Sequence, residues 1–156
     1  MTRRLAILVA ACTCGCARTP SPDWPALVRQ ALERSLERQS MRDAVHADVL
    51  VATSRGCRDE IPAGALLEPV ELPAGAAQLP IRRLESMPED EWATRTFSFL
   101  RVCALTKEHQ PYIYVTMITY WPPREYWTSL GTSGFKFRFR RSWGRWRIAA
   151  MEEWIS

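Results

Sequence analysis

His46 and Asp48 are the first residues whose types and spacing could do chemistry. They lie two apart in the segment 44–53, where apolar residues, mostly valines, alternate with polar ones as in a β-strand. Side chains two apart share a strand face, so this imidazole and carboxylate could form an acid-base pair or supply two metal ligands. No third ligand follows at a suitable spacing. We therefore expect no metal site, and a solvated polar face is the simpler interpretation.

The first residues have the order of a secretory leader. Arg3 and Arg4 precede an apolar run, 5–11, and small residues with three cysteines fill 11–17. The apolar run is too short to span a bilayer, which favours a signal peptide over a transmembrane helix. The segment resembles a bacterial lipoprotein signal, in which small residues precede the cysteine that is lipidated after cleavage.

Two cysteines fit the lipidation position. Cys12, after Val-Ala-Ala, matches the lipobox best by residue type, whereas Cys16 gives the signal a more usual length. If Cys16 carries the acyl chain, such as palmitate, only Cys57 and Cys103 remain. That even pair suits one disulfide in an oxidising compartment. We prefer Cys16, with Cys12 as the alternative.

The charge balance argues against a nucleic-acid partner. The 156 residues include 21 Lys and Arg against 17 Asp and Glu, and loss of Arg3 and Arg4 with the leader leaves 19 basic residues. Lys107 and Lys136 are the only lysines, and the sequence has no recognisable nucleic-acid module. Hydrophobic residues make up 47% of the chain, which is ordinary for a globular domain.

A helix is predicted after a short polar segment. From Trp24 to about Ser40, charged residues occupy one face, and the apolar residues fall on the other at helical spacing: Leu27, Val28, Ala31, Leu32 and Leu36. Ser21 or Asp23 can cap its first turn.

Four strands are predicted in the second half of the chain, at 96–106, 112–121, 135–141 and 146–155. The third has the clearest alternation, with one face formed by Phe135, Phe137 and Phe139. Its other face carries the cations Lys136, Arg138 and Arg140. A tight turn at Trp143 and Gly144 leads into the last strand, since glycine can take a positive φ. The ring face of this hairpin needs a cover.

This order of elements predicts an α+β fold. We expect one long N-terminal amphipathic helix packed on a curved antiparallel sheet of four to six strands. Glycine and proline interrupt 55–84 too often for long elements. The expected organisation is a signal peptide at 1–16, a tether at 17–23 and a single domain at 24–156.

The element order and the closing Phe-x-Phe-Arg and Gly-Arg-Trp-Arg-Ile resemble the NTF2-like superfamily. A cystatin-like arrangement fits the same pattern. The resemblance implies, for some members, isomerase or dehydratase activity with an Asp or Glu on a strand. Here only His46 and Asp48 fit, so a small-molecule isomerase or hydrolase is the alternative function. We expect a non-enzymatic binding module with no catalytic residue and no cofactor.

The connection 122–133 and the strand before it concentrate aromatic residues around Arg124. Trp, Tyr and Arg are the most frequent interface hot spots. The expected contact surface therefore consists of Tyr120, Trp121, Arg124, Tyr126, Trp127, Lys136, Arg138 and Arg140. Alternatively, Trp121 and Trp127 close the end of the sheet. The expected partners are a lipid bilayer, through the acyl anchor, and another envelope protein. We favour the outer membrane, facing the periplasm, because no Asp follows either candidate cysteine.

The leader can be tested on the protein purified from a bacterial membrane fraction. Mass spectrometry should find a chain that begins at Cys16, or at Cys12, with the added mass of acyl groups. If Cys16 is lipidated, Cys16→Ser should abolish that mass and Cys12→Ser should not, whereas the alternative at Cys12 predicts the reverse. An intact Met1 in the membrane-free fraction would contradict the prediction.

Overall fold

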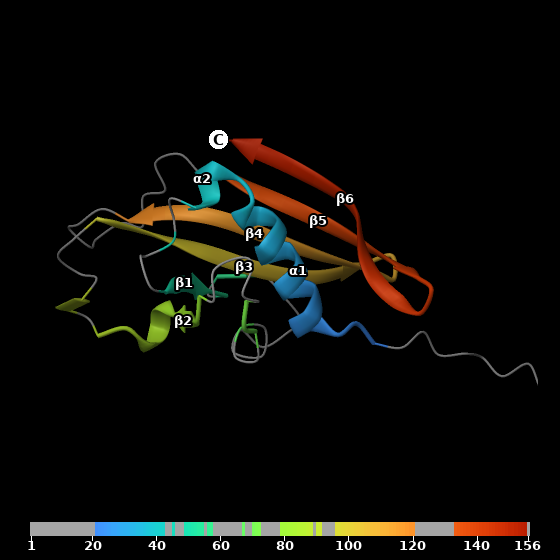
Figure 1. Ribbon diagram of the computed structural model, residues 1–156, viewed down its shortest axis with the longest axis horizontal. Coiled ribbons are helices and arrows are strands. Elements are labelled where there is room, and N and C mark those ends of the chain that lie inside the picture. Colours follow the sequence, from blue (N-terminus) through green and yellow to red (C-terminus); the bar gives the residue numbers. More distant parts are fainter. Residues whose placement is uncertain are drawn as a thin grey trace, which may run out of the picture.

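Six strands form one sheet in the computed structural model of the protein (Figure 1). The structure describes residues 21–42, 45, 49–54, 56–57, 67, 70–72, 79–88, 90–91, 96–120 and 133–155. The helical elements are α1 (Trp24–Leu36), α2 (Gln39–Arg42) and the 3-10 turn η3 (Leu84–Ser86). The strands are β1 (Leu50–Thr53), β2 (Ile81–Arg83), β3 (Phe97–Lys107), β4 (Gln110–Tyr120), β5 (Ser133–Ser142) and β6 (Arg145–Ile155).

The sheet is mixed, with the order β2-β1-β3-β4-β5-β6. The four long strands from β3 to β6 are antiparallel neighbours, whereas β1 runs parallel to both β2 and β3. The α+β class is confirmed, but the prediction of a purely antiparallel sheet is wrong at β1. A parallel neighbour requires a crossover connection, and the long segments between β1, β2 and β3 give the chain length enough to make one.

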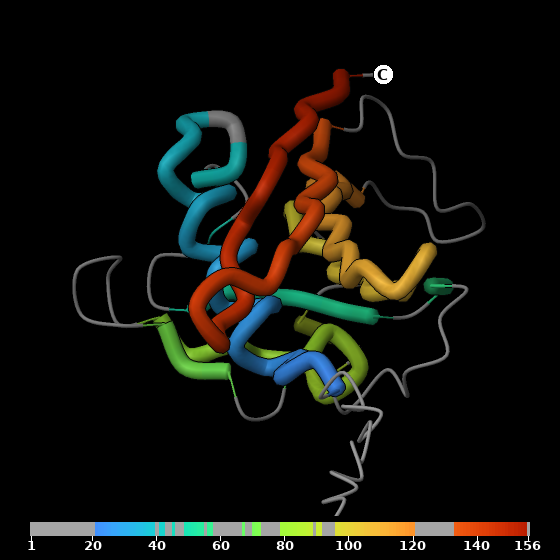
Figure 2. Tube along the Cα trace, turned by 90° about the vertical axis from the view of Figure 1, so that its right-hand side faces the viewer, coloured from blue at the N-terminus to red at the C-terminus, as the bar shows by residue number. Residues whose placement is uncertain are grey.

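Helix α1 covers one face of the sheet (Figures 1 and 2). Its apolar face packs on β4, β5 and β6, and the rings of Phe135, Phe137 and Phe139 are fully buried in the core that it covers. The cover that the ring face of β5 requires is therefore α1. Burying each such side chain contributes roughly 1.5–3 kcal/mol. The layer between α1 and the sheet, which holds most of the buried apolar residues, is therefore the main core.

The helix ends earlier than the sequence predicts. Helix α1 stops at Leu36, and the chain turns into α2 before Ser40. The turn brings Met41 into the same core, where it is fully buried. Burial of this methionine favours the turn over a straight continuation of the helix.

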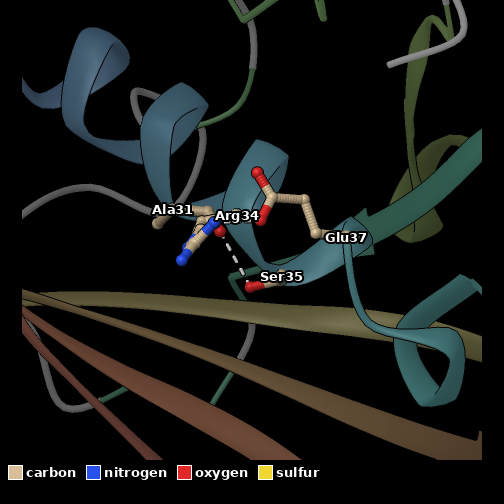
Figure 3. Close-up of polar contacts among 4 residues, drawn as sticks. All are labelled: Ala31, Arg34, Ser35 and Glu37. Carbon is tan, nitrogen blue, oxygen red and sulfur yellow. Dashed lines mark hydrogen bonds and ion pairs between the residues drawn. The ribbon is translucent and has the colours of Figure 1, made fainter.

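One polar side chain lies inside the buried face of α1. Ser35 donates its hydroxyl hydrogen to the carbonyl oxygen of Ala31 at 2.8 Å (Figure 3). A buried hydroxyl is costly without such a bond, so the contact satisfies it within the helix. One residue earlier, exposed Arg34 forms an ion pair with Glu37 at the end of α1.

The other face of the sheet is covered only in part by described residues. A second apolar cluster forms where η3 folds over the start of β3 and the end of β4. Its buried members are Val51, Leu84, Met87, Phe97, Phe99, Ile118 and Tyr120. At β5 and β6, the same face carries exposed or half-buried side chains. We call this part, from β4 to β6, the outward face.

The hairpin of β5 and β6 turns through two residues. Trp143 has φ 51° and Gly144 has φ 75°, and both central residues of a type I′ turn need a positive φ. Near the middle of the hairpin, Arg138 pairs with Ala150 and Phe139 with Ile148, so Ala149 forms a bulge. The bulge restores the alternation that keeps Phe139 and Ile148 toward the core.

A disulfide links the chain after β1 to β3. The Cα atoms of Cys57 and Cys103 lie 5.4 Å apart, and their Sγ atoms are bonded. These are the two cysteines that the sequence predicts to pair. The bond fixes the short strand β1 beside β3, where it makes few ladder pairs of its own.

Removal of this disulfide should lower the stability substantially. A closed loop spanning 46 residues restricts the unfolded chain, so the variant Cys57→Ser/Cys103→Ser should lose about 4 kcal/mol. Urea unfolding of variant and wild type measures the loss. As a control, reduced wild type should unfold like the variant. Equal midpoints for oxidised wild type and variant would contradict the prediction.

Candidate binding surface

The outward face is built by the pairing of three strands. In one row across it, Tyr114 of β4 is next to Lys136 of β5, which is next to Glu152 of β6. A neighbouring row runs from Thr116 through Gly134 to Trp154. The third row runs from Tyr112 through Arg138 to Ala150. Because strand side chains alternate, these residues face away from α1 as a consequence of the core packing on the other side.

Lys136 is neutralised within the chain. Its Nζ donates to Glu152 Oε2 at 2.9 Å and lies 5.7 Å from the centroid of the Tyr112 ring. The hydrogen bond to Glu152 is the main cause that raises the pKa of Lys136 above its ordinary value. The ammonium is therefore charged at physiological pH and already paired. Of the three predicted cations, Lys136 is the least available to a partner.

The ring of Trp154 lies against the backbone of Gly134, its neighbour on β5. A Cβ atom added to Gly134 would lie 2.3 Å from the ring carbon Cζ2 of Trp154, so only glycine admits this contact. The Trp154 ring also lies 6.3 Å from the ring of Tyr114. Cross-strand aromatic contacts of this kind stabilise a sheet, and the half-exposed rings form an apolar patch beside Lys136.

Arginines gather at the hairpin end of the outward face. Arg140 is directly opposite Arg147, and both are exposed. With Arg138, they line a hollow of about 520 Å³, to which Ser142 and Gln110 also contribute. Within the described part of the chain, none of their three guanidinium groups makes a hydrogen bond or ion pair. The hollow therefore combines three free guanidinium groups with neutral polar side chains, a donor set suited to an oxyanion.

The other predicted contact residues lie elsewhere. Tyr120 is only 3% exposed, and its ring packs 5.8 Å from that of Phe97 in the second apolar cluster. Its side chain is part of the core and is not presented to a partner. Outside the described residues lie Trp121, Arg124, Tyr126 and Trp127, together with His46, Asp48, Cys12 and Cys16.

The described residues do not assemble an acid-base site. The hairpin hollow has no Asp, Glu, His or Cys among its described lining residues, and neither does a second hollow of about 600 Å³ beside β2. Across the same described ranges, no three His, Cys, Asp or Glu side chains are grouped to hold a metal ion. Likewise, none of the described helices is long and apolar enough to cross a membrane.

Comparison with known proteins found no matching family model, no matching curated protein and no matching solved structure. The interpretation of the surface therefore depends on its own chemistry.

Sequence periodicity identified part of this surface. It placed Lys136, Arg138 and Arg140 on one strand face, but it did not reveal Arg147 or Trp154 as their neighbours. Both follow from the register of β5 against β6, which depends on the two-residue turn and the bulge at Ala149. Counting back from the turn could have paired Arg140 with Arg147, because the bulge lies beyond that pair.

The contact between Gly134 and Trp154 predicts a specific defect. The substitution Gly134→Ala should displace the Trp154 ring and lower the free energy of unfolding by roughly 1–3 kcal/mol, as overpacking does. Urea unfolding measures the loss, and a change in tryptophan emission reports the displacement. In a Trp154→Leu background the same substitution should cost much less. An equal cost in both backgrounds would show that the ring is not the cause.

Proposed function

We propose that the protein is a lipid-anchored envelope protein whose domain acts as a non-enzymatic binding module. The acyl anchor is on Cys16, with Cys12 as the alternative. The outward face, with Arg138 and Arg140, receives a partner that carries acidic and apolar groups. That partner is another envelope protein.

The single observation that carries the binding role is the composition of the outward face. Half-exposed aromatic rings lie beside arginines that have no partner among the described residues, on a rigid antiparallel sheet. Aromatic side chains supply contact area at low entropic cost, and arginine supplies several directed donors. A preformed surface of this kind binds without paying for reorganisation.

The anchoring role is supported by the order of the leader residues. Two arginines, a short apolar run and a cysteine cluster occur in the sequence expected for a lipoprotein signal. Under this proposal, Cys57 and Cys103 reside in an oxidising compartment. The disulfide of the structure is compatible with that setting.

The binding role can be tested by photo-crosslinking in intact cells. A photoreactive amino acid in place of Arg138 should give one dominant protein adduct, because this position lies on the outward face beside Tyr112 and Lys136. The same amino acid in place of exposed Arg42 in α2 is the control and should not give that adduct. Equal labelling from both positions, or none from Arg138, would reject the proposed surface.

A further inference from the structure

The tip of the β5–β6 hairpin exposes a tryptophan that does no packing in the described fold. Trp143 is 96% exposed, the highest value among the large hydrophobic residues described as exposed. Its φ of 51° lies in the left-handed region, where a bulky side chain costs about 1–2 kcal/mol. Asn or Gly would suit this turn position better. Neither burial nor turn geometry therefore accounts for a tryptophan here.

Arginines surround this tryptophan on both strands. Five occur within ten residues, at Arg138, Arg140, Arg141, Arg145 and Arg147, and the sequence from 126 to 151 contains no Asp or Glu. All five are exposed. The direct pairing of Arg140 with Arg147 places like charges opposite each other, which destabilises an isolated hairpin. Binding of an external polyanion, which neutralises these arginines, would therefore stabilise the tip.

Tryptophan next to arginine is the combination that suits a membrane interface. An indole ring is amphipathic and settles at the headgroup level, and guanidinium groups form paired hydrogen bonds with phosphate. The hollow between Arg138, Arg140 and Arg147 is large enough, at about 520 Å³, for one phosphate group. A narrow turn that presents one apolar ring has little area for a protein interface but can enter a headgroup layer.

The position of the tip is compatible with the proposed anchor. Helix α1 begins at the same end of the molecule as the hairpin turn, whereas α2 and the end of β6 lie toward the other end (Figures 1 and 2). The Gln30 side chain contacts the Trp146 carbonyl oxygen, at 3.5 Å, which ties α1 to the tip. The tether that joins α1 to a lipidated cysteine would thus start beside the tip.

We infer that the tip, defined as Arg138, Arg140, Arg141, Trp143, Arg145 and Arg147, docks on a membrane surface of anionic phospholipids. Trp143 enters the headgroup layer, and the arginines bind lipid phosphates. This docking orients the domain on the membrane that, under the proposed function, holds its anchor. Arg138 and Arg140 then lie where the tip meets the outward face, and the rest of that face, around Tyr114 and Trp154, stays free to meet a second protein.

Vesicle binding of the full chain tests this inference. We would compare vesicles of phosphatidylglycerol mixed with phosphatidylcholine against phosphatidylcholine alone, and use brominated lipids to quench tryptophans that enter the headgroup layer. Wild type should prefer the anionic vesicles, with binding that weakens as salt rises. Brominated lipid should quench one more tryptophan in wild type than in Trp143→Asn.

Three variants separate docking from folding. Trp143→Asn should unfold at an equal or higher temperature, because Asn-Gly suits the turn, yet bind several-fold more weakly. Arg140→Gln and Arg147→Gln should each weaken binding to anionic vesicles about fivefold, the equivalent of about 1 kcal/mol per arginine. Matched controls at the other end are Ile155→Ala, which removes an exposed apolar side chain, and Arg42→Gln, which removes an exposed charge. Neither control should change binding.

The outcomes that overturn the inference are distinct. Unchanged vesicle binding and quenching in Trp143→Asn would reject docking by the tip, even if mass spectrometry finds the acyl anchor. Loss of binding in the tip variants would support docking even if no acyl group is found, and only the anchoring proposal would then fail. Tip-dependent binding of inorganic phosphate, a nucleic acid or a single protein, without vesicle binding, would identify another ligand and reject the lipid surface.

Discussion

Burial of the phenylalanine face of β5 under α1 is the contact on which the rest of the molecule depends. Phe135, Phe137 and Phe139 are fully buried, and a strand with three rings on one face cannot rotate without exposing all of them. The same alternation fixes Lys136, Arg138 and Arg140 on the opposite face. The position of the cations is therefore a consequence of the core, and packing energy holds them where their mutual repulsion alone would not.

The two edges of the sheet are protected differently. Short β2 forms one edge, and β6, eleven residues long, forms the other. A long free edge invites pairing with another chain. Strand β6 counters this with the bulge at Ala149, with charged side chains along its length, and with the bond from Gln30 to the Trp146 carbonyl oxygen. Edge protection and the outward face thus use the same strand.

The sequence revealed periodicity but not pairing. Alternation and helical spacing sufficed for the ring face of β5, its cover α1, and the turn at Trp143 and Gly144, because these are local patterns. The parallel placement of β1 was not predictable, since four residues carry little periodicity and their partners lie about 30 and 50 residues away. The pairing of Lys136 with Glu152 was missed for another reason, because the bulge at Ala149 shifts the register between the turn and this pair. Periodicity shows which charged residues lie on one face of a strand. The register against the neighbouring strand determines which of those charges are already paired.

In the core, the local preferences of the residues agree with the fold, but at the hairpin tip they do not. At the core, helix spacing, strand alternation and burial all favour one arrangement, which is how a sequence specifies a single fold. At the tip, Trp143 occupies a turn position that favours small residues, and Arg140 faces Arg147. Each feature lowers the stability of the fold. An Asn-Gly turn in place of Trp143 and Gly144 would remove the first of these costs. Local conflicts of this kind concentrate where a surface has a task other than folding. The hairpin tolerates these unfavourable features because burial of the phenylalanines on its other face offsets the stability that is lost at the tip.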